Sequence, residues 1–169
     1  PFSQVVQEAL EKGYTEPDPR EDLSGNDVGR KLLILARELD LKNEFSEGVI
    51  ENLIPEALQG LDAPGFLAQM SKLDPIFAKI KAGLAPDEVL RYMGVLGGDL
   101  QKDKGQLSAG LSKVPKQSPL GQVKGADSII EIYTESYGNR PIVIQGAGAG
   151  ATVTARGVFG DILRIVEKN

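Results

Sequence analysis

The chain has 169 residues, of which 41% are hydrophobic and 25% charged, a composition typical of one soluble globular domain with its own core. Its net charge of −5 argues against nucleic acid or an anionic membrane as a partner, and it has no apolar run long enough to span a bilayer. It contains neither cysteine nor histidine, which excludes disulfides, thiol chemistry and Ser-His-Asp catalysis, and we expect no metal site. Any acid or base must therefore be a carboxylate, a lysine or a tyrosine.

The first residues predict a helix. Apolar residues recur at helical spacing from Phe2 to Leu10, Ser3 is a candidate N-cap, and Gly13 ends the pattern. The segment has neither the basic start nor the long apolar stretch of a signal peptide, so we expect a cytoplasmic protein. Because the chain opens on Pro1 without an initiator methionine, we interpret it as part of a longer polypeptide.

A second helix is predicted after a loop that two prolines stiffen. Pro17 and Pro19 disfavour helix in the residues before them, so the loop is expected to be extended there. A helix start of the form S-x-x-[DE] follows, with Ser24 as N-cap and Asp27 as the third helical residue, and the apolar stripe runs to about Leu39. Other apolar residues lie off this stripe, which predicts a helix that is buried on several sides.

The rest of the chain predicts mostly strands. After a weak strand at VIENLIP and two short helices at about residues 64–73 and 75–82, VLRYMGVLG and QLSAGLSKV predict an antiparallel pair around a polar loop. SIIEIYTESY and RPIVIQ are further strand-like runs, and a glycine-rich turn and an apolar helix follow them. A helical first third followed by clustered strands predicts an α+β fold, with a mixed, largely antiparallel sheet covered by helices.

The densest group of charged side chains lies in YTEPDPREDLSGNDVGRK, residues 14–31. On a helix, Lys31 falls at the edge of the apolar face with Asp27 one turn before it, whereas Arg30 and Arg37 lie on the opposite, solvent side. Such a lysine suits a general acid held by its aspartate, and carboxylates nearby suit a substrate ammonium group. The simpler alternative, which the residues alone favour, is an exposed i,i+4 ion pair beside a solvated acidic loop.

The second candidate site is the run from Gly146 to Gly150, which follows a strand and opens a helix. Backbone N–H groups in such a position attract phosphate or another anion. The spacing is G-x-G-x-G, not the G-x-G-x-x-G of a dinucleotide fingerprint. The pattern therefore predicts either a secondary contact to a nucleotide held mainly elsewhere, or close packing of the helix on neighbouring backbone.

Both segments match one family. GYTEPDPREDLSGNDVGRK resembles the signature of homoserine dehydrogenases, and GAGAGATVTARGVFGDILR resembles the C-terminal segment of the same family. The resemblance implies NAD(P)-dependent interconversion of L-aspartate 4-semialdehyde and L-homoserine, in threonine, methionine and isoleucine biosynthesis. It also implies the fold of that family's catalytic domain and a homodimer. The form of the family that is fused to aspartate kinase carries the same motif.

Carried over by position, the resemblance gives roles to four charged residues. Lys31 would protonate the carbonyl oxygen of the substrate. Asp27 would orient Lys31 and hold the substrate. Glu16 and Asp22 would contact the polar end of the substrate or tie the site together.

The resemblance also implies contacts to NADP or NAD at Gly13, Gly148 and Gly150. The family's main dinucleotide-binding fold and its monovalent cation site precede the matching segment, and the sequence predicts neither here. We therefore expect a catalytic and dimerisation domain at residues 1–144, and a turn and helix at residues 145–169 that would pack against the nucleotide-binding domain. We predict that the 169-residue chain alone has no appreciable dehydrogenase activity.

Some residues depart from the family pattern. Glu21 stands where aspartate is usual, Asn26 replaces an apolar residue, and Gly29 replaces an alanine inside a helix at a cost of about 1 kcal/mol in helix propensity. Arg156 stands where a small residue is common. Two other functions stay open: a non-enzymatic oligomerisation or amino-acid-binding regulatory module, and a hydrolase that uses a carboxylate pair.

Overall fold

The computed structural model describes residues 1–148 and 150–167. Its contacts divide the chain into two compact units, Pro1–Val114 and Pro115–Asn169, and each unit is described by itself. Among the described residues, we find no helix with the length and apolar character that crossing a membrane demands.

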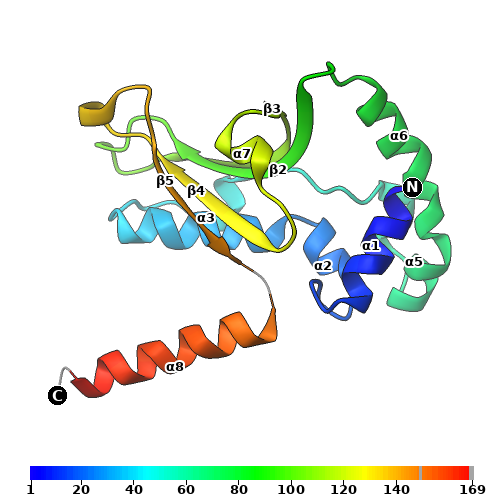
Figure 1. The fold of residues 1–169 in the computed structure, drawn as a ribbon, viewed down its shortest axis with the longest axis horizontal. Coiled ribbons are helices and arrows are strands. Elements are labelled where there is room, and N and C mark those ends of the chain that lie inside the picture. The colour runs from blue at the N-terminus through cyan, green and yellow to red at the C-terminus, as the bar shows by residue number, and fades with distance from the viewer. Residues whose placement is uncertain (149, 168–169) are drawn as a thin grey trace. The chain divides into compact units, whose positions relative to one another are not determined.

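The first unit begins with three helices, α1 (Phe2–Glu11), α2 (Pro19–Leu23) and α3 (Asn26–Glu38) (Figure 1). The prediction that Ser3 caps α1 is wrong, because Pro1 holds the N-cap position and Ser3 lies inside the helix. The Ser3 backbone N–H donates to Asp74 Oδ1 at 2.7 Å, and the Ser3 hydroxyl donates to Asp74 Oδ2 at 2.8 Å. A distant carboxylate therefore satisfies the free N–H groups at this helix start.

Helix α3 starts one residue later than predicted. Gly25, not Ser24, is its N-cap, with φ 74° and ψ 0°. Ser24 ends α2 instead: its hydroxyl donates to the Glu21 carbonyl at 2.8 Å and accepts from the Asn26 N–H at 3.3 Å. The chain changes direction between the short α2 and α3, and a glycine with left-handed backbone makes this turn.

One face of α3 is buried against the sheet of the same unit. Leu32 and Ala36 are buried on that face, as predicted. Ile34 is 61% exposed, and Leu35 and Leu39 are also exposed. The expectation of burial on several sides is therefore wrong within this unit, because the sheet covers only part of the apolar stripe.

Short helical segments follow α3, and all of them except the first contribute side chains to the first core. They are η1 (Phe45–Glu47), α4 (Glu56–Gln59), α5 (Ala63–Gln69), η2 (Met70–Leu73) and α6 (Asp74–Ala82). Phe66 and Leu73 are fully buried at the centre of this core. The rings of Phe2 and Phe77 stack with centroids 3.6 Å apart, so that α1 and α6 are joined.

The sheet of the first unit has the strand order β1-β3-β2. β1 (Val49–Ile50) pairs in parallel with β3 (Gln106–Pro115), and β2 (Glu88–Gly97) lies on the other side of β3. The predicted strands around the polar loop are confirmed, whereas only two residues of VIENLIP form a strand. Leu107 and Ala109 of β3 join Leu32 and Ala36 in a second core.

The loop between β2 and β3 is fastened by one buried side chain. Asn43 is 2% exposed; its Nδ2 donates to the Gly105 carbonyl and its Oδ1 accepts from the Gly105 N–H, both at 2.9 Å. An exposed ion pair joins Lys42 to Asp103 at 2.9 Å beside it. The amide of Asn43 thus replaces the partner strand that this stretch of backbone lacks.

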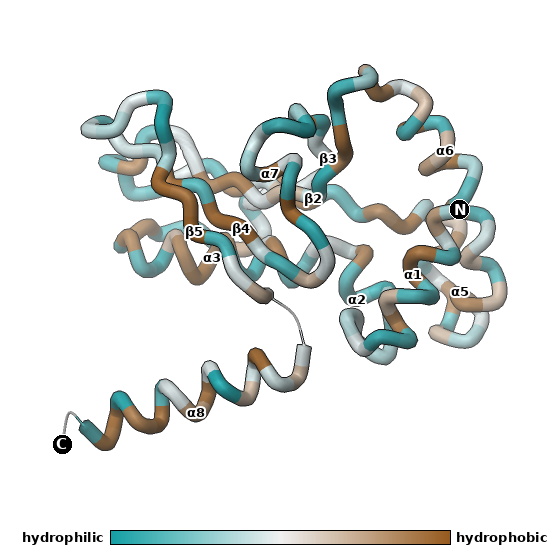
Figure 2. The backbone as a smooth tube through the Cα atoms, viewed as in Figure 1, coloured by the Kyte–Doolittle hydropathy of each residue, from teal (hydrophilic) through white to brown (hydrophobic). Residues whose placement is uncertain are grey.

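The second unit contains α7 (Pro119–Gln122), β4 (Asp127–Ile132), η3 (Glu135–Tyr137), β5 (Ile142–Ala147) and α8 (Ala151–Glu167). β4 and β5 form an antiparallel pair in which Ile130 lies opposite Ile144. Hydrophobic residues follow both strands and α8 (Figure 2), yet none of the described residues in this unit is buried. The α+β prediction is confirmed, with the strands divided between two sheets. The predicted boundary at residues 144–145 falls inside β5 and stays a functional prediction.

Candidate functional site

The loop at Pro17 leads into α2, a helix that the sequence did not predict. Asp18 has extended backbone, as predicted, and caps α2 by accepting from the Arg20 N–H at 3.1 Å. Pro19 occupies the first helical position, where its missing N–H costs nothing, and Glu21 follows in the first turn. An Asp-Pro pair before acidic residues was therefore the signal that could have predicted this helix.

Arg20 fastens this loop to a distant part of the same unit. Its Nε donates to Asp18 Oδ1 at 2.9 Å, and its terminal nitrogens reach Asp18 Oδ2 and the Leu61 carbonyl. The hydrogen bonds from Arg20 lower the pKa of Asp18 below its ordinary value. Asp18, to which the resemblance gives no catalytic role, thus positions the loop.

The predicted ion pair is present on α3. Lys31 Nζ lies 2.7 Å from Asp27 Oδ2, and the two side chains are 68% and 60% exposed. The structure therefore gives Lys31 more solvent contact than the edge of an apolar face suggested. The ammonium group and its aspartate are both open to a substrate.

All four charged residues with predicted substrate or proton-transfer roles line one open pocket of about 570 Å³. Its lining consists of Glu16, Pro17, Asp18, Glu21, Asp22, Asp27, Arg30 and Lys31. Carboxylates outnumber the cations five to two in this lining, which favours a ligand that carries a positive group. Arg30, which was predicted only to face solvent, also contributes to the pocket.

Asp22 links the loop to α2. Its Oδ2 accepts a hydrogen bond from the Glu16 backbone N–H at 3.0 Å, which fixes where the Glu16 side chain begins. Burial raises the pKa of Asp22 above its ordinary value, and the charges of Glu16 and Asp27 add to this effect. Asp22 thus holds the backbone of Glu16 beside α2, and the carboxylates of Glu16 and Asp27 make this part of the pocket negatively charged.

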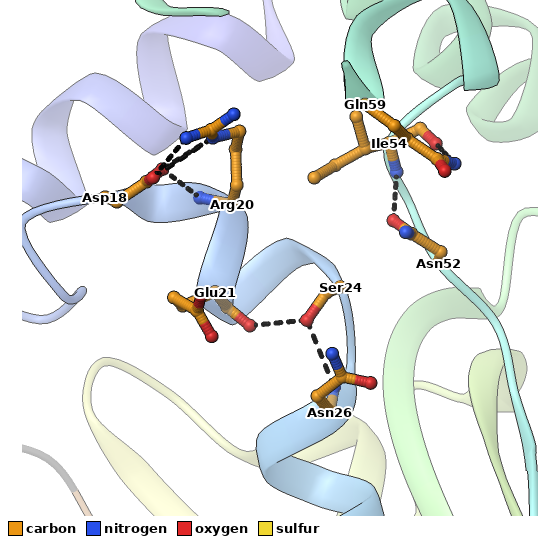
Figure 3. Close-up of a pocket in the computed structure, with 8 residues that line it drawn as sticks. All are labelled: Asp18, Arg20, Glu21, Ser24, Asn26, Asn52, Ile54 and Gln59. Carbon is orange, nitrogen blue, oxygen red and sulfur yellow. Dashed lines mark hydrogen bonds and ion pairs between the residues drawn. The ribbon is translucent and has the colours of Figure 1, made fainter. Parts of the chain in front are cut away.

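A second pocket of about 300 Å³ lies between α2 and the segment from Asn52 to Gln59 (Figure 3), and it shares Asp18 and Glu21 with the first. Its lining consists of Asp18, Arg20, Glu21, Ser24, Asn26, Asn52, Ile54 and Gln59. Asn52 Oδ1 accepts from the Ile54 N–H at 2.8 Å, and Gln59 Nε2 donates to the Ile54 carbonyl at 2.7 Å. These amides shape the turn around Ile54, and Arg20, already bound to Asp18 and the Leu61 carbonyl, is the charged residue that this pocket adds to those of the first.

Gly13, predicted to lie near the cofactor, ends α1 in a regular capping motif. It has φ 66°; its N–H donates to the Leu10 carbonyl at 3.0 Å, and the Tyr14 N–H donates to the Ala9 carbonyl at 2.9 Å. This is the Schellman arrangement, and it explains the glycine without a ligand. A Cβ at Gly13 would meet no atom within 4 Å in the described part of the chain, so its backbone is also accessible.

The other two predicted cofactor residues lie in the second unit and differ from each other. A Cβ at Gly148 would overlap the Ser128 hydroxyl, so this glycine is needed for packing. Gly150 has φ 114°, stands before α8 and has open space around it within the described residues. Residue 149 of the same run lies outside the described residues.

Comparison with known proteins shows the family to which this chain belongs. The family model described as "Homoserine dehydrogenase" matches residues 1–163. The chain belongs to the homoserine dehydrogenase family.

Curated relatives agree with this assignment. The chain is 46% identical over 167 residues to the bifunctional aspartokinase/homoserine dehydrogenase of Daucus carota, with 98% of this chain and 18% of that protein covered. It is 42% identical over 174 residues to the homoserine dehydrogenase of Emericella nidulans, with 99% of this chain and 46% of that protein covered. The chain thus spans less than half the length of these relatives.

Solved structures show the same fold. A Candida auris protein of unknown function is 40% identical, with a TM-score of 0.80 and 98% of this chain and 46% of that chain covered. The homoserine dehydrogenase of Thiobacillus denitrificans is 23% identical, with a TM-score of 0.65 and 95% and 32% covered. At that identity the second likeness concerns the fold alone.

Proposed function

We propose that this chain forms the substrate-binding and proton-transfer part of a homoserine dehydrogenase that interconverts L-aspartate 4-semialdehyde and L-homoserine. The observation that carries the proposal is the single pocket that joins the Asp27–Lys31 ion pair to Glu16 and Asp22. Membership of the family supports the choice of substrate. The exposed ion pair alone would equally suit a solvated surface.

Lys31 acts as the general acid in this proposal. A lysine side chain is protonated at neutral pH, so its Nζ has a proton to donate to the carbonyl oxygen of the aldehyde. The nicotinamide cofactor, when bound, supplies the hydride that the carbonyl carbon receives. The carbonyl bond pair becomes the new O–H bond, the product is the alcohol, and Lys31 is left as a neutral amine. Solvent reprotonates this amine through its exposed side.

Asp27 holds the acid in place. Its Oδ2 accepts from the Lys31 ammonium at 2.7 Å and directs that group over the pocket. The substrate also carries an α-ammonium group, and Glu16 and Asp22 supply anionic partners for it. Burial raises the pKa of Asp22, with smaller contributions from the charges of Glu16 and Asp27, and a bound cation would favour its ionised form.

The cofactor in this proposal is NAD or NADP, and this chain contributes only secondary contacts to it. The open space beside the backbone of Gly13 and of Gly150 would let such a molecule approach. The space beside Gly148 is occupied by the Ser128 side chain. Residues 1–144 would supply catalysis and dimerisation, and residues 145–169 would contact the nucleotide-binding domain. We further propose a homodimer, a cytoplasmic location and a place in threonine and methionine biosynthesis.

Steady-state kinetics of the full-length protein with Lys31→Met tests the proposal. Loss of the general acid should lower kcat for aldehyde reduction by about 10²–10⁴-fold. Lys81→Met, which removes an exposed charge from α6, should leave kcat unchanged and serves as the matched control. A Lys31→Met enzyme with kcat within twofold of the parent would contradict the proposal and favour a binding or regulatory module.

A further inference from the structure

The groups assigned to substrate and proton lie on two helices that meet at a short joint. Asp22 belongs to α2, whereas Asp27 and Lys31 belong to α3. Gly25 forms the joint with left-handed backbone at φ 74°. Because Asp27 and Lys31 share one helix, α3 itself fixes their separation, but their distance from Asp22 depends on the angle at Gly25.

The side chain of Tyr92 presses on this joint from β2. A Cβ added at Gly25 would overlap the Tyr92 hydroxyl oxygen and lie 2.8 Å from its Cζ. The same Cβ would lie 3.0 Å from Ile50 Cγ2, so β1 closes the joint from a second direction. Gly25 is therefore required both by its backbone conformation and by the tyrosine against it.

Tyr92 is itself fixed by hydrogen bonding. Its hydroxyl donates to the Glu51 carbonyl at 2.6 Å, and the Glu51 N–H donates to the Ala109 carbonyl of β3 at 2.8 Å. Two residues further on, the Leu53 N–H donates to the carbonyl of Leu23, the last residue of α2, at 2.9 Å. The segment that holds the tyrosine thus also holds the end of α2. Burial raises the pKa of Tyr92, which keeps its hydroxyl protonated as a donor.

Helix α3 packs closely against β1 and β2. A Cβ at Gly94 of β2 would come within 2.8 Å of Val28 Cγ1, and a Cβ at Gly29 would come within 2.9 Å of Ile50 Cδ1. One turn beyond the joint, the backbone of β2 therefore lies against a side chain of α3, and the backbone of α3 lies against a side chain of β1. A change at Gly25 would consequently alter the angle of α2 to α3 rather than the seat of α3.

We propose that Tyr92 is a positioning residue for proton transfer, whose hydroxyl sets the angle at Gly25 and so places Asp22 opposite the Asp27–Lys31 pair. This inference rests on the proposed function of Lys31. Tyr92 touches neither substrate nor cofactor in this role. Its removal leaves the acid in place and changes the alignment of the two halves of the pocket.

The first experiment compares Tyr92→Phe with Tyr133→Phe in the full-length protein. Both changes delete one hydroxyl, and that of Tyr133, a side chain that is 62% exposed, bonds only the Glu131 side chain among the described residues. Tyr92→Phe should lower kcat for aldehyde reduction about tenfold and raise KM for the aldehyde, since misplacement of bound groups is costly. Tyr133→Phe should change neither. An unchanged kcat and KM in Tyr92→Phe overturns the inference, and so does a lower kcat with unchanged KM, the result expected of partial unfolding alone.

A second experiment uses the fit between the two residues. Gly25→Ala places a methyl group where the Tyr92 hydroxyl lies, so it should impair the parent enzyme more than it impairs the Tyr92→Phe background. The double-mutant cycle in kcat/KM should therefore be non-additive, with Tyr92→Phe relieving part of the damage. Additive losses would overturn the inference even if one single variant proves unstable.

Lys31→Met, assayed beside these variants, separates the two proposals. If Lys31→Met is inactive while Tyr92→Phe is normal, the positioning role fails and the proton-transfer role stands. If Lys31→Met keeps its activity, the proposed function fails, whatever Tyr92 does.

Discussion

The two units of the chain bury their apolar side chains to very different extents. The unit Pro1–Val114 has two clusters of buried residues, around Phe66 and around Leu32. The unit Pro115–Asn169 is also rich in β-branched and aromatic side chains, yet its described residues include none that is buried. The charged pocket lies in the unit that has cores of its own.

The difference indicates which part of the chain can hold a site by itself. Preorganised groups must sit on elements whose own positions are fixed by packing and hydrogen bonds. In the first unit, α2 and α3 are held by Arg20, Tyr92 and two cores. In the second unit, β4 and β5 are held by their pairing, but no buried core supports them or α8 in the part that the structure describes. Four changes, taken from the largest expected effect to the smallest, examine this contrast.

Truncation of a core side chain should show the difference between the two units most clearly. Leu73→Ala removes a fully buried side chain from the first core and should lower the free energy of unfolding by about 2–5 kcal/mol. Ile144→Ala acts on a side chain that is 55% exposed and should change it by less than about 0.5 kcal/mol. Urea unfolding of the 169-residue chain measures both, and equal losses would erase the contrast between the units.

Loss of the buried Asn43 side chain amide in the first unit should give the next largest loss of stability. Asn43→Ala leaves the N–H and the carbonyl of Gly105 without their partner and should cost about 1–3 kcal/mol. Asn139→Ala changes an exposed asparagine of the second unit and should be nearly neutral. Hydrogen exchange should also show faster exchange of the Gly105 amide in Asn43→Ala. Unchanged protection there would mean that other contacts hold the loop.

The cap of α1 should give a smaller effect that depends on pH. The Ser3 hydrogen bonds lower the pKa of Asp74, so its stabilising effect is present above the ordinary aspartate pKa and is lost as the pH falls through the lowered value. Asp74→Asn should therefore lower Tm by a few °C at about pH 7 and by less at about pH 2. Asp87→Asn, an exposed control, should show no such difference between the two pH values. A pH-independent change in Asp74→Asn would point to lost packing instead.

Substitution of Asp22 should stabilise the protein, unlike the other three changes, and its effect should be the smallest. Its pKa is raised by burial, so the stabilisation is fully present below the ordinary aspartate pKa and is lost as the pH rises through the raised value. At neutral pH, Asp22→Asn should therefore raise the free energy of unfolding by a few tenths of a kcal/mol. The same variant should lose activity in the full-length protein. A less stable Asp22→Asn protein at neutral pH would show that its carboxylate supports the fold.

Local patterns predicted those elements that have strong local signals. The period of the apolar stripe indicated α3, and the alternating runs around GDLQKDKG indicated β2 and β3. The charged segment was identified from density and helical spacing, and the structure brings its four candidates into one pocket. The pairing of Lys31 with Asp27 follows directly from that spacing.

Contacts between distant residues could not be predicted in this way. Nothing near Ser3 indicates that Asp74 caps its helix, and nothing near Gly25 indicates that Tyr92 lies against it. Gly29 shows the same limit: helix propensity alone predicts a gain from alanine, but a Cβ there would crowd Ile50 and Phe45. The missed α2 is different, because its Asp-Pro signal was local.

Chemical rescue of Lys31→Ala by primary amines tests the central claim most directly. The claim is that the Lys31 ammonium group donates the proton to the aldehyde oxygen, and a small alkylammonium ion should take its place in the vacated space. Added methylamine or ethylamine should raise the rate of aldehyde reduction by the full-length variant and leave the parent enzyme unaffected. The rescued rate should also vary with the acidity of the amine, as general acid catalysis requires. A Lys31→Ala enzyme that stays fully active, or that folds and binds its substrate but is accelerated by no amine, would contradict the account.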